Sequence, residues 1–158
     1  YRFVVPGYNV RPLELSGAVG LVQLQKLDEG LAQRRANARV FTLLFGRDKR
    51  FFTPKEIYGE SSWFSFPMVL RPEVPCTRAE VLAKLKEVGI EYRIVTGGNF
   101  LQQDVIKHFD YSVVQRGVPN AELVHERGFF VGNCARRPLG EELLLLQETL
   151  RTVPEPVG

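Results

Sequence analysis

The spacing of apolar residues predicts two consecutive helices in the first third of the chain. The first covers residues 12–28, with Pro12 in a first turn whose N–H groups have no intrahelical partner in any case. Its apolar positions are Leu13, Leu21, Leu24 and Leu27. The second covers residues 29–45 and is ended by Gly46. Its apolar positions are Leu31, Ala38, Phe41, Leu44 and Phe45.

The first predicted helix contains an unusually small stretch at residues 16–20, Ser-Gly-Ala-Val-Gly. Glycine in a helix interior costs up to about 1 kcal/mol relative to alanine. We therefore expect a close backbone approach that offsets this cost. The approach is either tight packing within the chain or contact at a subunit interface.

Beyond residue 50, short strands alternate with helices. Residues 62–71 alternate as a strand, in which Pro67 indicates an edge position or a bulge. The face predicted to be apolar consists of Phe64, Phe66, Met68 and Leu70. Thr77 and Glu80 form a capping box at the start of a helix. Further strands are predicted over residues 90–95 and 129–131, a loop over 96–99, and helices over 102–109, 119–127 and 140–152. The order of elements predicts an α+β domain with a small, mainly antiparallel sheet.

The composition excludes several classes of protein. No apolar run reaches the roughly 20 residues that span a bilayer, so we expect no membrane association. The net charge is +3, but the basic residues are dispersed, which favours an anionic small substrate over nucleic acid. Cys76 and Cys134 lack metal-ligand or disulfide spacing, so we expect no metal site and a cytoplasmic setting. The chain opens at Tyr1 without a signal peptide, and we expect it to be part of a larger gene product.

Three segments, in order, resemble the DegT/StrS sugar-aminotransferase family. They are residues 7–18 (Gly-Tyr-Asn-Val-Arg-Pro-Leu-Glu-Leu-Ser-Gly-Ala), residues 60–66 (Glu-Ser-Ser-Trp-Phe-Ser-Phe) and residues 93–133, which contain Thr-Gly-Gly-Asn-Phe and Gly-Phe-Phe-Val-Gly-Asn. The Arg-Pro-Leu-Glu-Leu-Ser-Gly form is particularly similar to the sugar-nucleotide 3-dehydratase branch. The sequence departs from that branch around Arg93. Arg93 is followed directly by Ile94, where the branch has a proline between the arginine and the isoleucine, and the loop that follows has two glycines.

The resemblance implies the aspartate-aminotransferase fold (type I), in which a large cofactor domain precedes a small α+β domain. Residues 1–28 would form the end of the large domain and a first interface helix. Residues 29–158 would form the C-terminal small domain, with a helical linker at 29–46 and an α+β unit at 51–158. The resemblance also implies a homodimer with active sites between subunits. The catalytic base would lie upstream of Tyr1, so we expect no catalytic residue in this chain and no activity from it alone.

The implied cofactor is pyridoxal 5′-phosphate (PLP) or its amine form, pyridoxamine 5′-phosphate (PMP), which acts as an electron sink. The implied reaction removes the C3 hydroxyl of a nucleotide-activated 4-keto-6-deoxy sugar in deoxysugar and O-antigen biosynthesis, and glutamate restores the amine. An aminotransferase of the same family, which leaves the amine on the sugar, is one alternative. A non-catalytic dimerisation or ligand-binding module is an alternative of another class. An upstream histidine would indicate the dehydratase, and an upstream lysine the aminotransferase.

The resemblance assigns Asn9 and Arg11 to cofactor binding. Both stand just before a predicted helix N-terminus, where free N–H groups and the helix dipole favour an anion. The alternatives are a simple helix cap for Asn9 and a surface ion pair for Arg11.

Six residues are candidate contacts for the substrate: Trp63, Phe64, Arg93, Asn99, Phe100 and His125. The alternative for the two aromatic residues of the strand is a place in the core. The alternative for the residues around the 96–99 loop is ordinary turn chemistry, although loops at strand ends are common places for ligand contacts. For His125 the alternative is a position on the surface of a helix.

Overall fold

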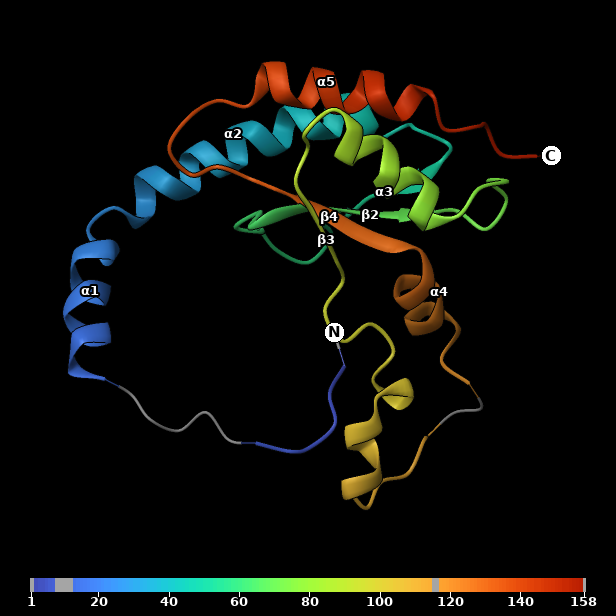
Figure 1. Cartoon of the computed structure of the whole chain (residues 1–158). Helices are drawn as coiled ribbons and strands as arrows, with labels where there is room; N and C mark the ends of the chain where they lie inside the picture. The colour runs from blue at the N-terminus through green and yellow to red at the C-terminus, as the bar shows by residue number, and fades with distance from the viewer. Residues whose placement is uncertain (1, 8–12, 115–116, 158) are drawn as a thin grey trace.

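The computed structural model describes residues 2–7, 13–114 and 117–157. Its four-stranded sheet has the order β1-β2-β4-β3 and is antiparallel throughout. The strands are β1 (Phe51–Phe52), β2 (Ser65–Leu70), β3 (Tyr92–Ile94) and β4 (Gly128–Gly132). The helices are α1 (Glu14–Leu24), α2 (Leu27–Phe45), α3 (Arg78–Glu87), α4 (Pro119–Arg127) and α5 (Gly140–Arg151), with 3-10 helices η1 (Phe100–Gln102) and η2 (Asp104–His108). The predicted α+β class with a small antiparallel sheet is confirmed (Figure 1).

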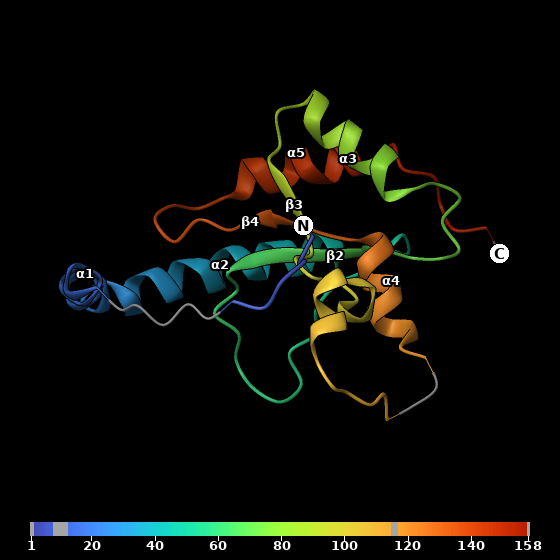
Figure 2. The same cartoon turned by 60° about the horizontal axis from the view of Figure 1, so that its bottom comes forward.

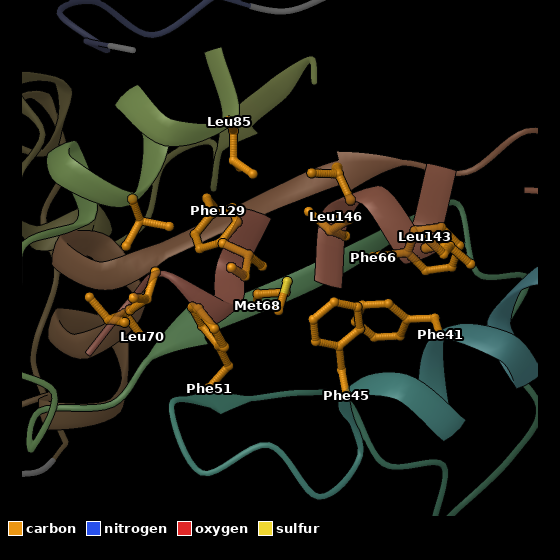
Figure 3. Close-up of a cluster of buried hydrophobic side chains, with 14 of the residues drawn as sticks. Phe41, Phe45, Phe51, Phe66, Met68, Leu70, Leu85, Phe129, Leu143 and Leu146 are labelled. Carbon is orange, nitrogen blue, oxygen red and sulfur yellow. The ribbon is translucent and has the colours of Figure 1, made fainter. Parts of the chain in front are cut away.

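The hydrophobic core lies between one face of the sheet and the helices α2, α3 and α5 (Figure 1). Alternate residues of β2 (Phe66, Met68 and Leu70) are fully buried, because successive side chains of a strand point to opposite faces. Figure 3 shows how they meet aromatic side chains from α2 and β4. The ring of Phe41 stacks on that of Phe66 with 4.7 Å between centroids. The apolar face predicted for this strand is therefore confirmed from Phe66 onward.

The predicted alternation is wrong at Phe64, whose side chain is 69% exposed. Trp63 is buried in its place, and its indole N–H donates to Glu56 Oε1 at 3.1 Å. The reason is the backbone of Trp63, which has φ +48° in the left-handed region and so reverses the alternation. Such a conformation costs about 1–3 kcal/mol in a non-glycine residue. Burial of the large indole ring offsets this cost.

Pro67 lies in β2, which is an interior strand of the sheet, but β1 is too short to pair with this part of β2. The strand β1 pairs only with Val69 and Leu70, so Pro67 has β4 as its one strand neighbour within the described residues. The predicted edge strand or bulge is therefore wrong for β2, and the proline is tolerated because its missing N–H removes no bond to β1. Sequence periodicity does not predict β1 itself, because a two-residue strand has too few positions to show a pattern.

The single helix predicted over residues 12–28 is wrong at its C-terminal end. The helix α1 ends at Leu24, and the backbone leaves the helical conformation at Lys26 (φ −103°, ψ 1°) before α2 begins at Leu27. Neither glycine nor proline marks this break in the sequence. The direction of α2 is instead set by the residues that it buries in the core, Asn37, Ala38, Phe41 and Phe45.

The helix α1 stands away from the sheet in both views (Figures 1 and 2) and buries no side chain. A Cβ added at Gly17 or Gly20 would meet nothing within 4 Å. The expectation that the small stretch packs tightly within the chain is therefore wrong among the described residues. In the same residues, no helix has both the length and the apolar composition needed to cross a bilayer.

The α-helix predicted over residues 102–109 is replaced by the two short 3-10 helices η1 and η2. Between them Gln103 is extended (φ −86°, ψ 138°). Its side chain accepts the N–H of Phe3 at 3.0 Å and donates to the carbonyl of Gly97 at 3.2 Å. These bonds to segments distant in sequence hold Gln103 in place and interrupt the helix.

Arg50 closes the end of the core at the turn between α2 and β1. Its side chain is buried, donates to Asp48 Oδ2 at 2.6 Å, and donates to the carbonyl of Leu150 at 2.6 Å. Hydrogen bonding to Asp48 raises the pKa of Arg50, although burial opposes the shift. The hydrogen bond to Leu150 therefore fastens this turn to the end of α5, and the ion pair with Asp48 lies within the turn itself.

The capping box at the start of α3 is confirmed. Thr77 Oγ1 accepts the N–H of Glu80 at 3.3 Å, and Glu80 Oε2 accepts the N–H of Thr77 at 2.7 Å. The backbone hydrogen bond and then the hydroxyl bond lower the pKa of Glu80. Because the folded pKa is below the unfolded one, this stabilisation is complete above the unfolded pKa. It is lost as pH falls through the folded pKa.

We expect Thr77→Val to raise the pKa of Glu80 toward its ordinary value, because the substitution removes the hydroxyl that binds the carboxylate. NMR titration of the Glu80 side-chain carboxyl carbon measures this change. Thr42→Val, at an exposed threonine on α2, is the control and should leave the titration unchanged. An unaltered Glu80 pKa in Thr77→Val would contradict the assignment of the cap.

Candidate functional site

The face of the sheet that α2, α3 and α5 leave open carries a cavity of about 550 Å³. Its lining residues are Phe64, Ser65, Glu91, Tyr92, Arg93, Thr96, Phe130, Gly132 and Asn133. Strand register explains the grouping, since Ser65 pairs with Gly132 and Arg93 pairs with Phe130. Paired residues of adjacent strands point to the same face, so three strands contribute to one floor.

An arginine from α2 borders the aromatic side of this cavity. The guanidinium carbon of Arg34 lies 5.6 Å from the ring centroid of Phe64, which is within cation–π range. The Nε of Arg34 is buried and has no hydrogen-bond partner in the described part of the chain. Arg93 brings a second guanidinium from β3. The lining therefore holds flat rings with one arginine and one acid, Glu91, and the guanidinium of Arg34 beside Phe64 adds a second positive charge at the edge. Guanidinium groups next to aromatic rings suit a ligand that has an anionic part and a planar part.

Asn133 fixes the rim of the cavity. Its Nδ2 donates to the carbonyl of Trp63 at 2.8 Å and to the carbonyl of Arg34 at 3.1 Å. Its Oδ1 accepts from Asn37 Nδ2 at 3.0 Å. One amide thus joins the end of β4, the segment before β2, and α2.

Asn37 on α2 stands behind this rim and is only 2% exposed. Its Oδ1 accepts the N–H of Leu139 at 3.1 Å. Its Nδ2 also donates to the carbonyls of Cys134 and Arg137, at 3.0 and 3.1 Å. The buried side chain of Asn37 therefore fastens the loop that follows β4 to α2, in addition to the bond from Asn133 to Arg34.

A second cluster fastens the 96–99 loop to α4. Asn99 is buried, its N–H donates to His125 Nδ1 at 3.1 Å, and its Nδ2 donates to Glu122 at 2.6 Å. Because Nδ1 accepts, the neutral imidazole of His125 carries its proton on Nε2. Gly98 has φ +49°, and a Cβ there would lie 2.9 Å from the Cα of His125. Only glycine fits this close approach.

The structure brings together two of the predicted substrate contacts, because Phe64 and Arg93 both line the open-face cavity. Trp63 is in the core and does not line that cavity. Asn99 and His125 hold the loop, as just described.

Phe100 is half exposed, and its ring centroid lies 6.4 Å from that of Phe3. The two predicted cofactor contacts, Asn9 and Arg11, lie outside the described residues. No group of three His, Cys, Asp or Glu side chains in residues 2–7, 13–114 and 117–157 is placed to hold a metal ion.

Sequence reasoning missed Tyr92, Phe130 and Asn133 as lining residues. A signal for two of them exists, because Phe130 and Asn133 belong to the Gly-Phe-Phe-Val-Gly-Asn segment at 128–133. Strand alternation in that segment sends Phe129 into the core and Phe130 to the open face. The aromatic residue that lies outside the core is therefore the one that lines the cavity.

A family model matches residues 1–134, a range that includes every residue lining this cavity. The chain belongs to the DegT/DnrJ/EryC1/StrS aminotransferase family. Family membership confirms the resemblance that the three sequence segments indicated.

Two relatives place the chain more closely within the family. It is 48% identical over 134 residues to a GDP-4-keto-6-deoxy-D-mannose 3-dehydratase of Yersinia pseudotuberculosis, which covers 84% of this chain and 34% of the relative. A solved structure of the E. coli enzyme of that name, with bound hydrated PLP, has a TM-score of 0.82 at 42% identity and covers 95% of this chain and 38% of that one. The expected aminotransferase-type fold and the likeness to the 3-dehydratase branch are confirmed. The chain spans little more than a third of the length of these relatives.

We expect Asn37→Ala to lower the free energy of unfolding by roughly 2–4 kcal/mol, because it leaves buried groups of the loop after β4 without partners. Urea denaturation of the 158-residue chain measures this loss. The matched control is Gln33→Ala, which removes a half-buried side chain that donates to Asn37 Oδ1 at 3.0 Å. The control should cost less than about 1 kcal/mol. Equal losses for both variants would contradict the central role of Asn37.

Proposed function

We propose that this chain is the C-terminal part of a PLP-dependent 3-dehydratase that acts on a GDP-linked 4-keto-6-deoxy sugar. The observation that carries the proposal is the open-face cavity, which Phe64 and Arg93 both line and where the guanidinium of Arg34 stands beside the ring of Phe64. A nucleotide sugar joins a diphosphate to a flat base, and guanidinium groups and aromatic rings recognise these two parts. The extent of identity to the Yersinia dehydratase supports the same choice of reaction.

Two further crystal structures support the classes of substrate. A GDP-4-keto-6-deoxymannose 3-dehydratase variant that is 42% identical to this chain contains GDP-perosamine. Another structure, 43% identical, holds a trapped adduct of PLP and glutamate. We therefore propose a nucleotide sugar and glutamate, the amino donor, as the substrates of the intact protein.

The described residues fit a supporting role toward PLP, which supplies an electron sink when bound. No lysine is among the residues that line the open-face cavity, so this part of the chain offers no amine for covalent attachment of the cofactor there. Arg93 in its lining, with Arg34 beside the ring of Phe64, suits a carboxylate or phosphate group instead. Asn9 and Arg11, outside the described residues, are proposed to reach the cofactor phosphate.

The residues of this chain bind and orient in the proposed mechanism, and none of them is assigned a proton transfer. Arg93 neutralises the anionic part of the substrate, and the ring of Phe64 covers the planar part. Asn133 keeps the rim in place through its bonds to two carbonyl groups. The strong coupling of this rim to the core limits its reorganisation when the substrate binds.

An aminotransferase of the same family is the second candidate. A UDP-4-amino-4,6-dideoxy-N-acetyl-beta-L-altrosamine transaminase of Campylobacter jejuni is 34% identical, but over only 56% of this chain. The dehydratase is favoured because its likeness is greater and extends over more of the sequence. The residue that separates the two reactions is expected upstream of Tyr1.

We place the intact protein in the cytoplasm. Cys76 and Cys134 are both free thiols, and such thiols stay reduced in that compartment. Burial, more than any nearby charge, raises the pKa of the Cys76 thiol. The raised pKa disfavours the reactive thiolate.

The decisive assay uses the complete protein encoded by the gene that carries this chain, supplied with PLP, glutamate and GDP-4-keto-6-deoxymannose. We expect a product that has lost the C3 hydroxyl, with release of ammonia, detected by mass spectrometry. Arg93→Ala should raise KM for the nucleotide sugar by about tenfold, because one charged contact is lost. The control Arg136→Ala, at an exposed arginine outside the cavity, should leave KM unchanged.

Other products would overturn the proposed reaction. A sugar that keeps its C3 hydroxyl and gains an amine would assign the aminotransferase. A folded protein that binds the nucleotide sugar but forms neither product would favour the non-catalytic module.

A homodimer built partly on α1 belongs to the same proposal. This helix exposes its leucines at positions 15, 21 and 24 and buries no side chain, and large exposed apolar patches tend to associate. We expect sedimentation equilibrium of the 158-residue chain to detect dimers, and Gly17→Glu to weaken them by placing a charge on α1. Gly59→Glu is the matched control, because Gly59 also has open space around its Cα but lies outside α1. A strictly monomeric chain would disprove a dimer that depends on α1.

A further inference from the structure

A second cavity, of about 560 Å³, lies at the opposite end of β2 from the open-face cavity. Ser65 at the start of β2 lines the open-face cavity, whereas Arg71, just after the end of β2, lines the second one. The other walls of the second cavity come from the turn between α2 and β1, from β1, and from the C-terminal tail at Pro156 and Val157. The two cavities share no lining residue.

Basic side chains dominate the second cavity. Arg47, Lys49, Lys55 and Arg71 all line it. In the described part of the chain, none of these four side chains forms an ion pair or donates a hydrogen bond. Of the two acidic residues in the lining, Asp48 is already bound to the buried Arg50, at 2.6 Å. Glu73 is the one remaining acid, so the cavity carries a clear excess of positive charge.

Arg71 has the features of a preorganised binding group. Its guanidinium carbon lies 3.9 Å from the ring centroid of Phe52, so the planar group is stacked rather than free to rotate. Its Nε is buried and has no hydrogen-bond partner among the described residues. A buried N–H donor without a partner is costly. Because this atom is closed to solvent, a ligand would bind the terminal N–H groups of the same guanidinium, which lines the cavity.

We propose that this second cavity binds the phosphate group of a small phosphorylated ligand, with phosphate oxygens on the guanidinium of Arg71. A guanidinium presents its N–H donors in a planar fork that matches the spacing of phosphate oxygens. The surrounding lysines supply the further charge that a phosphate carries beyond a carboxylate. The volume falls within the range of small-molecule sites, about 300–1,000 Å³. This site lies outside the proposed catalytic cavity and does not depend on the proposed reaction.

Titration of the 158-residue chain with pyrophosphate, GDP and guanosine tests this site, with binding followed by calorimetry and by backbone amide NMR shifts. We expect pyrophosphate and GDP to bind saturably, with shifts at residues 46–55 and 71–73, and guanosine not to cause these shifts. If the natural ligand is a free phosphate compound, pyrophosphate and GDP should bind with equal affinity. If it is a nucleotide, GDP should bind more tightly than pyrophosphate. Either result supports the shared phosphate chemistry.

Three variants assign the binding to this cavity. Arg71→Ala and Lys55→Ala should each weaken pyrophosphate binding, the former by about tenfold or more. The side chain of Lys55 is exposed and forms no ion pair or hydrogen bond with the described residues, so Lys55→Ala protects the test against loss of folding. Lys26→Ala, at an exposed lysine outside the cavity, is the matched control and should bind normally. Three results would overturn the proposal: no saturable binding, unchanged binding in both cavity variants, or equal shifts at these residues with guanosine.

Discussion

The arrangement of the open-face cavity depends on one buried amide, Asn37 of α2. Its Oδ1 and Nδ2 together hold the loop after β4, through Leu139, Cys134 and Arg137. Through Asn133 the same amide also reaches the carbonyl of Trp63, and hence the segment that precedes β2. A buried amide is tolerated only when its polar atoms are bonded, so these elements can pack together only in the arrangement that bonds them.

The helices α2, α3 and α5 cover one face of the sheet, so the core residues lie on that face and the open-face cavity lies on the other. The face toward the helices carries the aromatic core around Phe41, Phe66 and Phe129 (Figure 3). The other face is left to half-buried and polar residues, among them Ser65, Phe130 and the exposed Arg93. The residues that line the open-face cavity therefore alternate with core residues along β2 and β4.

The chain corresponds in length to little more than a third of the relatives described above, and its sheet unit and its first helix differ in how they are packed. The core residues of the sheet unit pack against one another within the chain. The helix α1 stands away from the sheet (Figure 2) and buries no side chain. An apolar helix without a partner is unfavourable in water. The stability of the sheet unit and the placement of α1 are therefore separate problems, because no described α1 side chain is buried in the shared core.

The sequence by itself determined the elements whose causes are local. The Thr77–Glu80 capping box, the buried face of α2 and the alternation after Phe66 each depend on residues a few positions apart, and the family segments identified the fold. The tertiary structure alone decided the left-handed Trp63, the break at Lys26 and the extended Gln103, since long-range packing or bonds hold each of them. It also decided which arginines have a buried Nε atom without a hydrogen-bond partner among the described residues. Arg34 and Arg71 differ from the other dispersed basic residues because folding buries the Nε of each without a partner, and no local pattern encodes that environment.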